Sequence, residues 1–406
     1  MFCDGPFDDG NVFAFYLGRG SRNDYTFTMS VHSDGSSADG GGVEPQNQGS
    51  NSHGLGLSKT VTMAGVAKVA GISQGAISSL LNDRDYGIRV SPRTRERVFK
   101  ICRDLGYVPN DLRAVVRIYP ELGETCLLVS DKIPGGIANP YVARLTASLM
   151  SHISRMAASI GVMLYDETRD YGTLADLPSP LQHGTASKVL CVGAGNESIC
   201  RVVHARGLPA IMLGHTAHVA GTTSVVPDFA SAARLALDLL MRHGHVHVGI
   251  VSGPFGSHDP RLEEMNRAIA AAAADLGLAI EAENVFGGNL NFEAGVAAVQ
   301  HMLDRPSAPT ALLCLSERAA VGVIAAAHRH GIQVPEKFSV ITFSDHAGAI
   351  DSCIPMTAVV LPVDEIASAA VQESDRQIRE GIPTDAAKIT VGVRLIERET
   401  CGPVKK

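Results

Sequence analysis

The stretch TVTMAGVAKVAGISQGAISSLLN, residues 60–82, decides how this sequence folds. Its first half predicts a short helix with one buried face, because apolar residues recur at positions i, i+3, i+4 and i+7. These residues are Met63, Val66, Ala67 and Ala70. Its second half predicts another helix, whose buried face holds Ile77, Leu80 and Leu81. Thr62 and Ser73 are the expected N-caps, and Gly71 supplies the tight turn of a helix-turn-helix.

A third helical pattern follows and completes a small domain. Ser91 and Pro92 form a cap and first-turn pair, and Gly106 is the expected stop signal. The inward face of this helix is Val98, Ile101, Cys102 and Leu105. The patterns predict a three-helix helix-turn-helix domain over residues 59–108, followed by a connecting segment over residues 109–123.

Charge is divided unevenly along the chain, whose formal net charge is −7. Residues 59–117 hold eleven Lys or Arg against five Asp or Glu, whereas residues 118–406 hold 22 against 30. A basic segment joined to an acidic body is typical of a protein that presents one end to DNA phosphates. We therefore expect double-stranded DNA to bind the helix-turn-helix end.

From Thr125 onward, short apolar runs alternate with helical patterns at the spacing of βα units. The runs are CLLVSD, VMLYD, VLCVG, AIMLG, VGIVSG, ALLCLS and VITFSD. Each run ends in small or polar residues, as buried parallel strands do where a loop begins. Helical patterns fall at residues 139–158, 229–243, 261–276 and 292–304. This predicts a doubly wound α/β domain over residues 124–402, with its ligand at the carboxyl ends of the strands.

Several protein classes are disfavoured by composition. The eight cysteines are scattered without a CxxC pair, which argues against a disulfide framework and a zinc ribbon. No apolar run is long enough to cross a bilayer, and the first thirty residues lack the pattern of a signal peptide. We expect a cytoplasmic protein without a membrane partner, a metal or a cofactor. Residues 1–58 are rich in Gly, Ser, Asp and Asn and are expected to form a disordered tail.

Three motifs leave other chemistries open. Residues 71–75 satisfy the GxSxG elbow of hydrolases, but a helix rather than a strand is expected before the serine, so we do not expect an enzyme. The sequence GAGNES at residues 193–198 is a weak dinucleotide signal, and a βα turn explains it equally. His243, His245 and His247 could share one face of a strand and bind a metal, although we favour a structural role.

The sequence resembles the LacI/GalR family of bacterial transcription regulators. The resemblance rests on residues 60–82 and on VSPRTRERVFKICRDLGYVPN, residues 90–110, and it continues to Gly402. It implies a homodimeric repressor that binds a palindromic operator and carries a two-lobed effector domain similar to periplasmic binding proteins. It also implies a small-molecule effector, most commonly a carbohydrate. The alternative is a small-molecule binding protein without DNA-binding activity.

The family places its second helix in the DNA major groove, so residues near the start of that helix are implied to face base edges. They are Ser73, Gln74, Gly75, Ser78 and Ser79. Gln74 is the expected base reader because its amide can bind adenine with two hydrogen bonds, whereas Ser73 is first a cap. The implied phosphate contacts are Thr62, Arg89, Ser91, Thr94 and Arg95, and two contacts before the hinge are Tyr107 and Asn110.

The hinge of this family forms a helix on operator DNA and inserts a leucine into the minor groove. The corresponding segment here is DLRAVVRIYPELGE, residues 111–124. Val116 stands at the leucine position and Arg113 replaces a small alanine. We therefore expect a shorter wedge that kinks DNA less.

The resemblance also implies an effector site between two lobes. Its candidate residues are Asn139, Tyr141, Arg261, Phe292, Ser316, Glu317 and Asp345. Arg261 is the expected anchor for ligand hydroxyls or a carboxylate, and Phe292 the expected stacking partner. The sequence departs from the family at Ser316-Glu317, Ser344-Asp345 and Gly214, where acidic or amide groups are usual. The effector of a familiar member therefore cannot be assumed.

Overall fold

The computed structural model describes residues 13–19, 25–31, 61–82, 90–133, 135–154, 159–173, 176–193, 197–252, 260–288, 290–303, 305, 307–344 and 354–405. The chain divides into two compact units. One comprises residues 1–120 with 161–163, and the other comprises residues 121–160 with 164–406.

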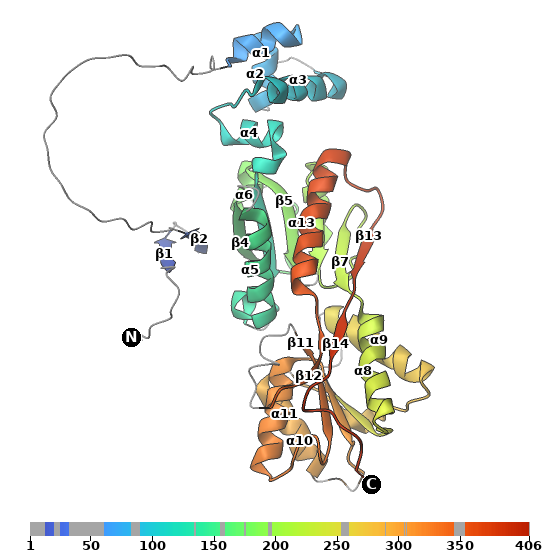
Figure 1. The fold of residues 1–406 in the computed structure, drawn as a ribbon. Coiled ribbons are helices and arrows are strands. Elements are labelled where there is room, and N and C mark those ends of the chain that lie inside the picture. The colour runs from blue at the N-terminus through green and yellow to red at the C-terminus, as the bar shows by residue number, and fades with distance from the viewer. Residues whose placement is uncertain are drawn as a thin grey trace, which may run out of the picture. The chain divides into compact units, whose positions relative to one another are not determined.

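The first unit contains the predicted helix-turn-helix. Its helices are α1 (Met63–Ala70), α2 (Gln74–Asn82), α3 (Pro92–Leu105) and α4 (Leu112–Ile118) (Figure 1). The predicted caps are confirmed, since the hydroxyls of Thr62 and Ser91 accept hydrogen bonds from backbone amides in the first turns of α1 and α3. Gly71 and Gly106 end these helices at φ 67° and 69°, a left-handed conformation that glycine adopts without steric cost.

A single apolar core holds these four helices together. Its most buried residues come from every helix and include Val66, Ile77, Val98, Cys102 and Ile118. Because Ala114 and Ile118 of α4 belong to this core, helices α1 to α4 form one unit, and this predicted DNA-binding unit has a fourth helix that the three-helix prediction left out.

The tail differs in part from the predicted disorder. Strands β1 (Phe13–Arg19) and β2 (Tyr25–Val31) pair in antiparallel register, with Phe13 opposite Val31. In the sequence YTFTMSV, residues 25–31, apolar or aromatic residues alternate with hydroxyl residues, a period-two pattern that is typical of a strand. The rest of residues 1–58 lies outside the described residues.

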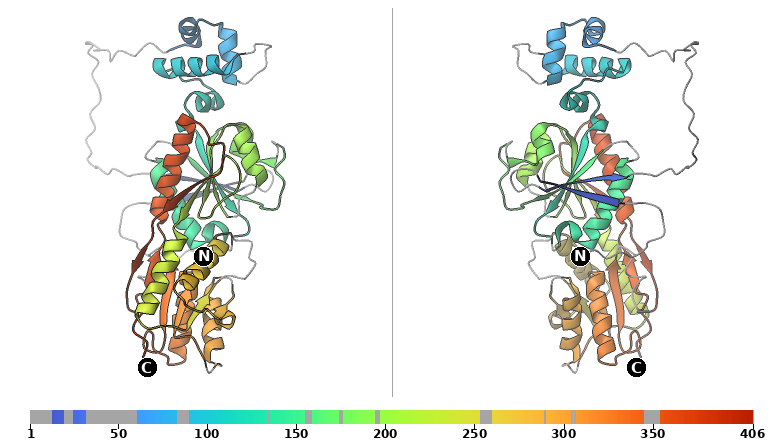
Figure 2. Two further views of the ribbon diagram at one scale, coloured as in Figure 1. Left: turned by 90° about the vertical axis from the view of Figure 1, so that its right-hand side faces the viewer. Right: turned by 90° about the vertical axis from the view of Figure 1, so that its left-hand side faces the viewer.

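The second unit is the predicted two-lobed α/β domain, and each lobe has a six-stranded sheet with helices on both faces (Figure 2). The first lobe has the strand order β13-β7-β6-β5-β3-β4. These strands are β3 (Glu124–Ser130), β4 (Ile160–Tyr165), β5 (Ala186–Val192), β6 (Ala210–Leu213), β7 (Thr223–Pro227) and β13 (Ala387–Val391). Its helices are α5 (Pro140–Ser154), α6 (Ser179–His183), α7 (Glu197–Ala205) and α13 (Val363–Glu380), of which α5 packs against α13.

The second lobe has the strand order β14-β12-β11-β10-β8-β9, in which only β14 runs antiparallel to its neighbour. These strands are β8 (Val248–Val251), β9 (Val285–Phe286), β10 (Ala311–Cys314), β11 (Ser339–Ser344), β12 (Thr357–Val360) and β14 (Arg394–Ile396). Its helices are α8 (Phe229–Arg242), α9 (Pro260–Asp275), α10 (Phe292–Leu303) and α11 (Glu317–Arg329). A short 3-10 turn lies in this lobe at Ala282–Asn284, and two others lie before and after β3, at Pro120–Leu122 and Gly136–Ala138.

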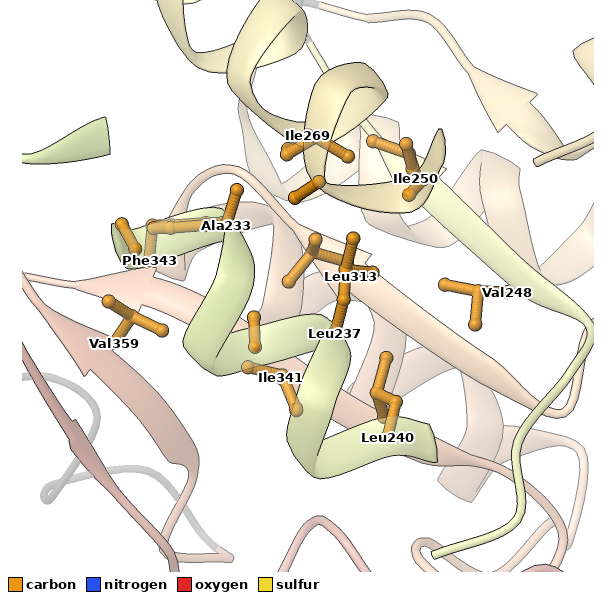
Figure 3. Packing of buried hydrophobic residues seen from close by; sticks show 14 of the residues in the cluster. Ala233, Leu237, Leu240, Val248, Ile250, Ile269, Leu313, Ile341, Phe343 and Val359 are labelled. Carbon is orange, nitrogen blue, oxygen red and sulfur yellow. The ribbon is translucent and has the colours of Figure 1, made fainter. Parts of the chain in front are cut away.

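One of the two cores of the second lobe lies between its sheet and helices α8 and α9, and the other involves helices α10 and α11. Leu237 of α8 and Ile269 of α9 pack on Leu313 and Ile341 of the central strands (Figure 3). The chain crosses between the lobes after β7, after β12 and after β13, so each lobe is built from separate segments of sequence.

Candidate DNA-binding surface and effector site

The start of α2 carries the expected base-reading residues. Ser73 is the N-cap of α2, because its Oγ accepts a hydrogen bond from the backbone N–H of Ala76 at 3.1 Å. Gln74 and Gly75 are exposed in the first turn, and Ser78 is half-buried one turn later. Helix α1 precedes this turn, so the strand that a GxSxG elbow requires is replaced by a helix.

Ser79 does not face outward with these residues. It is 8% exposed and lies one turn after the buried Ala76, on the inward side of α2. The fold therefore does not support the base contact that the resemblance implied for Ser79.

Two candidate phosphate contacts lie at helix N-termini. The Oγ1 of Thr62 accepts from the N–H of Gly65 at 3.2 Å, and the Oγ of Ser91 accepts from the N–H of Thr94 at 3.2 Å. Free N–H groups and the helix dipole make such positions favourable for an anion. The Arg95 side chain is exposed in the first turn of α3, while Arg89 lies outside the described residues.

The two positions before the hinge differ from each other. Asn110 is exposed, whereas Tyr107 is 8% exposed and belongs to the core of the DNA-binding unit. Burial also raises the pKa of the Tyr107 phenol. The implied DNA contact by the Tyr107 side chain is therefore not supported.

The hinge residues form helix α4, which begins where Asp111 Oδ1 accepts from the N–H of Arg113 at 2.9 Å. Arg113 is exposed and lies 3.6 Å from the same carboxylate. Val116, the expected wedge, is only 7% exposed, so the wedge prediction is not supported in this arrangement. The exposed apolar side chains near the start of α4 are instead Val108 and Leu112, at 62% and 54%.

The effector domain brings Tyr141 and Arg261 together across the two lobes. The Arg261 Cζ of α9 lies 5.2 Å from the centre of the Tyr141 ring of α5, which is within cation–π distance. A guanidinium in this position can bind hydroxyls or a carboxylate with two hydrogen bonds while its face rests on the ring. Tyr141 and Arg261 are therefore two implied effector residues that lie in contact across the lobes.

Gly214, which follows β6, makes room for this pair. A Cβ at Gly214 would lie 3.0 Å from Tyr141 Oη and 3.1 Å from Arg261 Cδ. Its φ of +87° also disfavours other residues. A side chain at position 214, such as the acidic one that the resemblance implies there, would require Tyr141 Oη and Arg261 Cδ to shift by a few tenths of an ångström.

A second inter-lobe contact was not predicted from sequence. The N–H and Oγ1 of Thr216 donate to Glu264 Oε1 and Oε2 at 2.6 and 3.1 Å. Thr216 follows β6 in the first lobe, and Glu264 lies in α9 of the second. Both carboxylate oxygens of Glu264 therefore accept from Thr216.

The other implied effector residues serve partly as helix caps. Asn139 Oδ1 accepts from the N–H of Tyr141 at 3.1 Å, and Ser316 Oγ accepts from the N–H of Ala319 at 3.1 Å. The Ser316 hydroxyl is also 2.6 Å from the carbonyl of Leu290. Asn139 and Ser316 therefore position the starts of α5 and α11.

Phe292 and Glu317 begin neighbouring helices. Phe292 is half-buried at the start of α10, where a Cβ at Gly322 would lie 2.0 Å from the Phe292 carbonyl oxygen. Glu317 is half-buried in the first turn of α11. The close backbone approach brings α10 and α11 together, while Asp345 lies outside the described residues.

Charged side chains that follow β3 and β4 are not among the residues predicted for the effector site. Lys132 Nζ lies 3.2 Å from Asp131 Oδ2 after β3, and this contact raises the lysine pKa. Asp166 after β4 accepts from the hydroxyl and the N–H of Thr168, which lower the pKa of its carboxyl. Their positions directly after apolar runs could have indicated them, because ligands of such folds bind at these strand ends.

His245, the central histidine of the three, has a structural role. His245 is 1% exposed and precedes β8, and its ring nitrogens lie 3.0 Å from Thr310 Oγ1 and Ser339 Oγ. Burial lowers its pKa, so it packs as a neutral ring. Among the described residues, no three His, Cys, Asp or Glu side chains are placed to share a metal ion. In the same part of the chain, no helix has the length and apolar character to cross a bilayer.

Comparison with known families matches the two units separately. Residues 62–110 match the model for bacterial regulatory proteins of the lacI family, and residues 237–401 match the periplasmic binding protein-like domain. Among similar proteins, the HTH-type transcriptional repressor CytR of Escherichia coli strain K12 is 29% identical over 317 residues, covering 76% of this chain and 87% of that protein. The HTH-type transcriptional regulator AscG of the same strain is 27% identical and covers 75% of this chain and 88% of AscG.

Solved structures share the fold. The complex of the transcriptional regulator CelR with cellobiose has a TM-score of 0.59 at 22% identity, covering 84% of this chain and 99% of that one. The lac repressor dimer bound to operator and the anti-inducer ONPF has a TM-score of 0.58 at 19% identity, with the same coverage of both chains.

Proposed function

Because the chain belongs to the lacI family of bacterial regulatory proteins, we propose that it is a transcriptional repressor that binds a specific operator and responds to a small molecule held between its lobes. The observation that carries this proposal is the start of α2, where a serine-capped first turn presents the exposed Gln74 and Gly75. A glutamine amide at such a position can read adenine in the major groove.

We infer that DNA-binding units act in pairs. One helix-turn-helix reads a half-site, and a palindromic operator matches the two-fold symmetry of a homodimer. The lac repressor, which shares this fold, was solved as a dimer on its operator. Thr62, Ser91, Thr94 and Arg95 would position each unit on phosphates, and Asn110 and Arg113 would continue this contact toward the hinge.

We infer that the effector is a small polar molecule of the carbohydrate class. Arg261 on the face of Tyr141 can bind vicinal hydroxyls, and Phe292 can stack on a sugar ring. CelR, whose fold is similar, was solved with cellobiose. Glu317 and Asp345 are the acidic candidates for further hydroxyls. Gly214 removes one usual acidic group, so the hydroxyl pattern of the ligand should differ from that of members that keep it.

A gel-shift titration tests the DNA-binding function. Purified full chain should retard a duplex taken from the promoter region beside its own gene at concentrations that leave a shuffled duplex free. Affinity should fall with added salt, and log K should drop about 0.9 per phosphate contact for each decade of salt. Retardation of both duplexes at equal concentrations, or of neither, would contradict a specific regulator. In the second case a small-molecule binding protein without DNA-binding activity would be the better description.

A further inference from the structure

The loop that follows β6 is fastened to the first lobe on both sides of Thr216. Before Thr216, the N–H of Gly214 donates to the carbonyl of Val225 at 2.9 Å. After Thr216, the N–H of Ala217 donates to Ser224 Oγ at 2.8 Å. Both acceptors belong to β7, so Thr216 is held in place relative to this strand.

Glu264, on the other side of the inter-lobe contact, is held by a core of the second lobe. Its neighbour Met265 is 5% exposed, and Ile269, further along α9, is fully buried. Both residues belong to the same apolar core as Ala233 and Leu237 of α8 (Figure 3). Sliding one packed helix past the other would open voids in this core, which is costly. Helices α8 and α9 therefore move as one body.

A crossover of the chain joins these two bodies. Strand β7 ends at Pro227 and α8 begins at Phe229, so Asp228 alone separates them. The hydrogen bonds from Thr216 to Glu264 at 2.6 and 3.1 Å close a ring through β7, the crossover, α8 and α9. A rotation of the lobes that draws α9 away from the loop must break these bonds or disrupt the core between α8 and α9. The bonds break first, because water can replace them, whereas nothing replaces the lost packing.

We propose that the Thr216–Glu264 contact is a latch beside the hinge of the effector domain, and that Glu264 sets the balance between arrangements of the two lobes. The contact stabilises each arrangement that contains it, and an arrangement in which α9 leaves the loop loses both bonds. Hydrogen bonds to a carboxylate are stronger than those to a neutral acceptor, which suits a latch. Glu264 is a positioning residue, because its two oxygens accept from the protein's own Thr216.

The latch also positions two of the implied effector residues. Arg261 lies one turn before Glu264 on α9, and its Cζ is 5.2 Å from the centre of the Tyr141 ring in the first lobe. Loss of the latch would let α9 carry the guanidinium away from the ring. The consequence for regulation rests on the proposed function: if operator affinity depends on the lobe arrangement, a change at Glu264 alters that affinity.

Hydrogen exchange on the full chain tests the latch. The reporter is the N–H of Asp228 in the crossover, which donates to the carbonyl of Val391 at 2.8 Å. In Glu264→Ala this amide should exchange about fivefold faster than in wild type, because freer rotation of the lobes opens the crossover more often. A contact that merely orders the loop would change exchange at Thr216 and leave Asp228 as it was. An unchanged rate at Asp228 would overturn the proposal.

Two further variants at α9 serve as rescue and control. Glu264→Gln keeps an acceptor without the charge, so it should recover part of the protection at Asp228. Glu263→Ala alters the neighbouring exposed glutamate and should leave the exchange rate at Asp228 as in wild type. Equal effects of Glu264→Ala and Glu263→Ala would contradict the role of Glu264.

A change on the other lobe covers the case in which Glu264→Ala unfolds the second lobe. Faster exchange of the Leu315 amide, which donates to the carbonyl of Val251 at 2.9 Å, would reveal such unfolding. Thr216→Val removes the hydroxyl and keeps the N–H donor, so it should speed exchange at Asp228 about twofold. In a chain that already carries Glu264→Ala, Thr216→Val should have no further effect. Full additivity of the two changes would show that the side chains act independently and would overturn the latch.

An operator titration tests the consequence for regulation. The probe is a duplex that the full chain retards specifically, and Glu264→Ala should change its affinity at least about threefold while Glu263→Ala leaves it unchanged. Equal affinities of wild type and Glu264→Ala would contradict a regulatory role of the latch. Failure of wild type to bind any duplex specifically would instead contradict the proposed function, and the exchange results at Asp228 would still decide whether the latch exists.

Discussion

Gln74 is the residue on which base recognition depends in the proposed function. Its replacement by alanine should weaken operator binding by about 1 to 3 kcal/mol and relax the preference at one base pair of each half-site. The measurement is a titration of both proteins against the operator and against single-base variants. Equal weakening on every sequence, including unrelated DNA, would show that Gln74 contacts phosphates rather than a base.

Gly214 is the residue that lets Tyr141 and Arg261 meet. Gly214→Ala should lower the free energy of unfolding by about 1 to 3 kcal/mol beyond the cost of its positive φ, because the new Cβ meets both side chains. Gly277→Ala is the matched control, since Gly277 also has a positive φ but nothing within 4 Å of its Cβ position. Equal losses in the two variants, measured by denaturant unfolding, would show that Gly214 matters only for backbone conformation.

The helix caps could be predicted from the sequence, whereas the exposure of several expected DNA contacts could not. The caps Thr62, Ser73 and Ser91 could be predicted because their effect is local, extending three residues along the chain. For Ser79, Tyr107 and Val116, the resemblance implies a DNA contact only from their positions in a family pattern. Each is at most 8% exposed, because the packing of a fourth helix and the rotation of each side chain depend on distant residues.

At the scale of elements, helix α9 meets the loop after β6 through Glu264 and Thr216. Glu264→Ala should speed hydrogen exchange at the Thr216 amide about tenfold, because that N–H donates to the Glu264 carboxylate. Glu263→Ala is the control, since this neighbouring glutamate is exposed. Glu264→Gln keeps an acceptor and should behave more like wild type. An unchanged exchange rate of the Thr216 amide in Glu264→Ala would show that this contact does not hold the two lobes together.

Seven of the twelve strands in the two sheets could be predicted from their apolar runs, and five could not. All of the seven except the edge strand β4 lie inside a sheet, where parallel strands are buried on both faces. The edge strands β9 and β14 have only two and three residues and the edge strand β13 is half-exposed, so these three give no clear apolar run. Strands β7 and β12 were missed although they are as buried as the strands that were predicted. Contacts between distant parts of the chain were also not predicted. Thr216 and Glu264 are 48 positions apart, and Leu81 and Arg117, whose side chain binds the Leu81 carbonyl, are 36 positions apart. Such pairs carry no periodic signature.

At the scale of the whole molecule, the basic charge of the DNA-binding unit serves two purposes. Arg97, Arg103 and Arg117 donate to helix carbonyls within the unit, which directs them toward its own backbone. Arg95 and Arg113 are exposed and remain candidates for phosphates. Fewer arginines than the charge count suggests are therefore available to contact DNA phosphates.

A homodimer is the second expectation at this scale. Multi-angle light scattering of the full chain at micromolar concentration should give a mass twice the 42.7 kDa of one chain. A palindromic operator requires two units related by a two-fold axis, and the effector domain is the expected source of the interface. A mass of one chain at all concentrations, with or without DNA, would contradict paired recognition.

Selection from random duplex DNA tests the central claim most directly. The purified full chain is incubated with a library of random sequence, bound duplexes are recovered and amplified over several rounds, and the enriched sequences are read. The account predicts a palindromic motif, and it predicts that Gln74→Ala selects the same motif with one symmetric base pair relaxed. Enrichment of no sequence, or of a motif without two-fold symmetry, would contradict it.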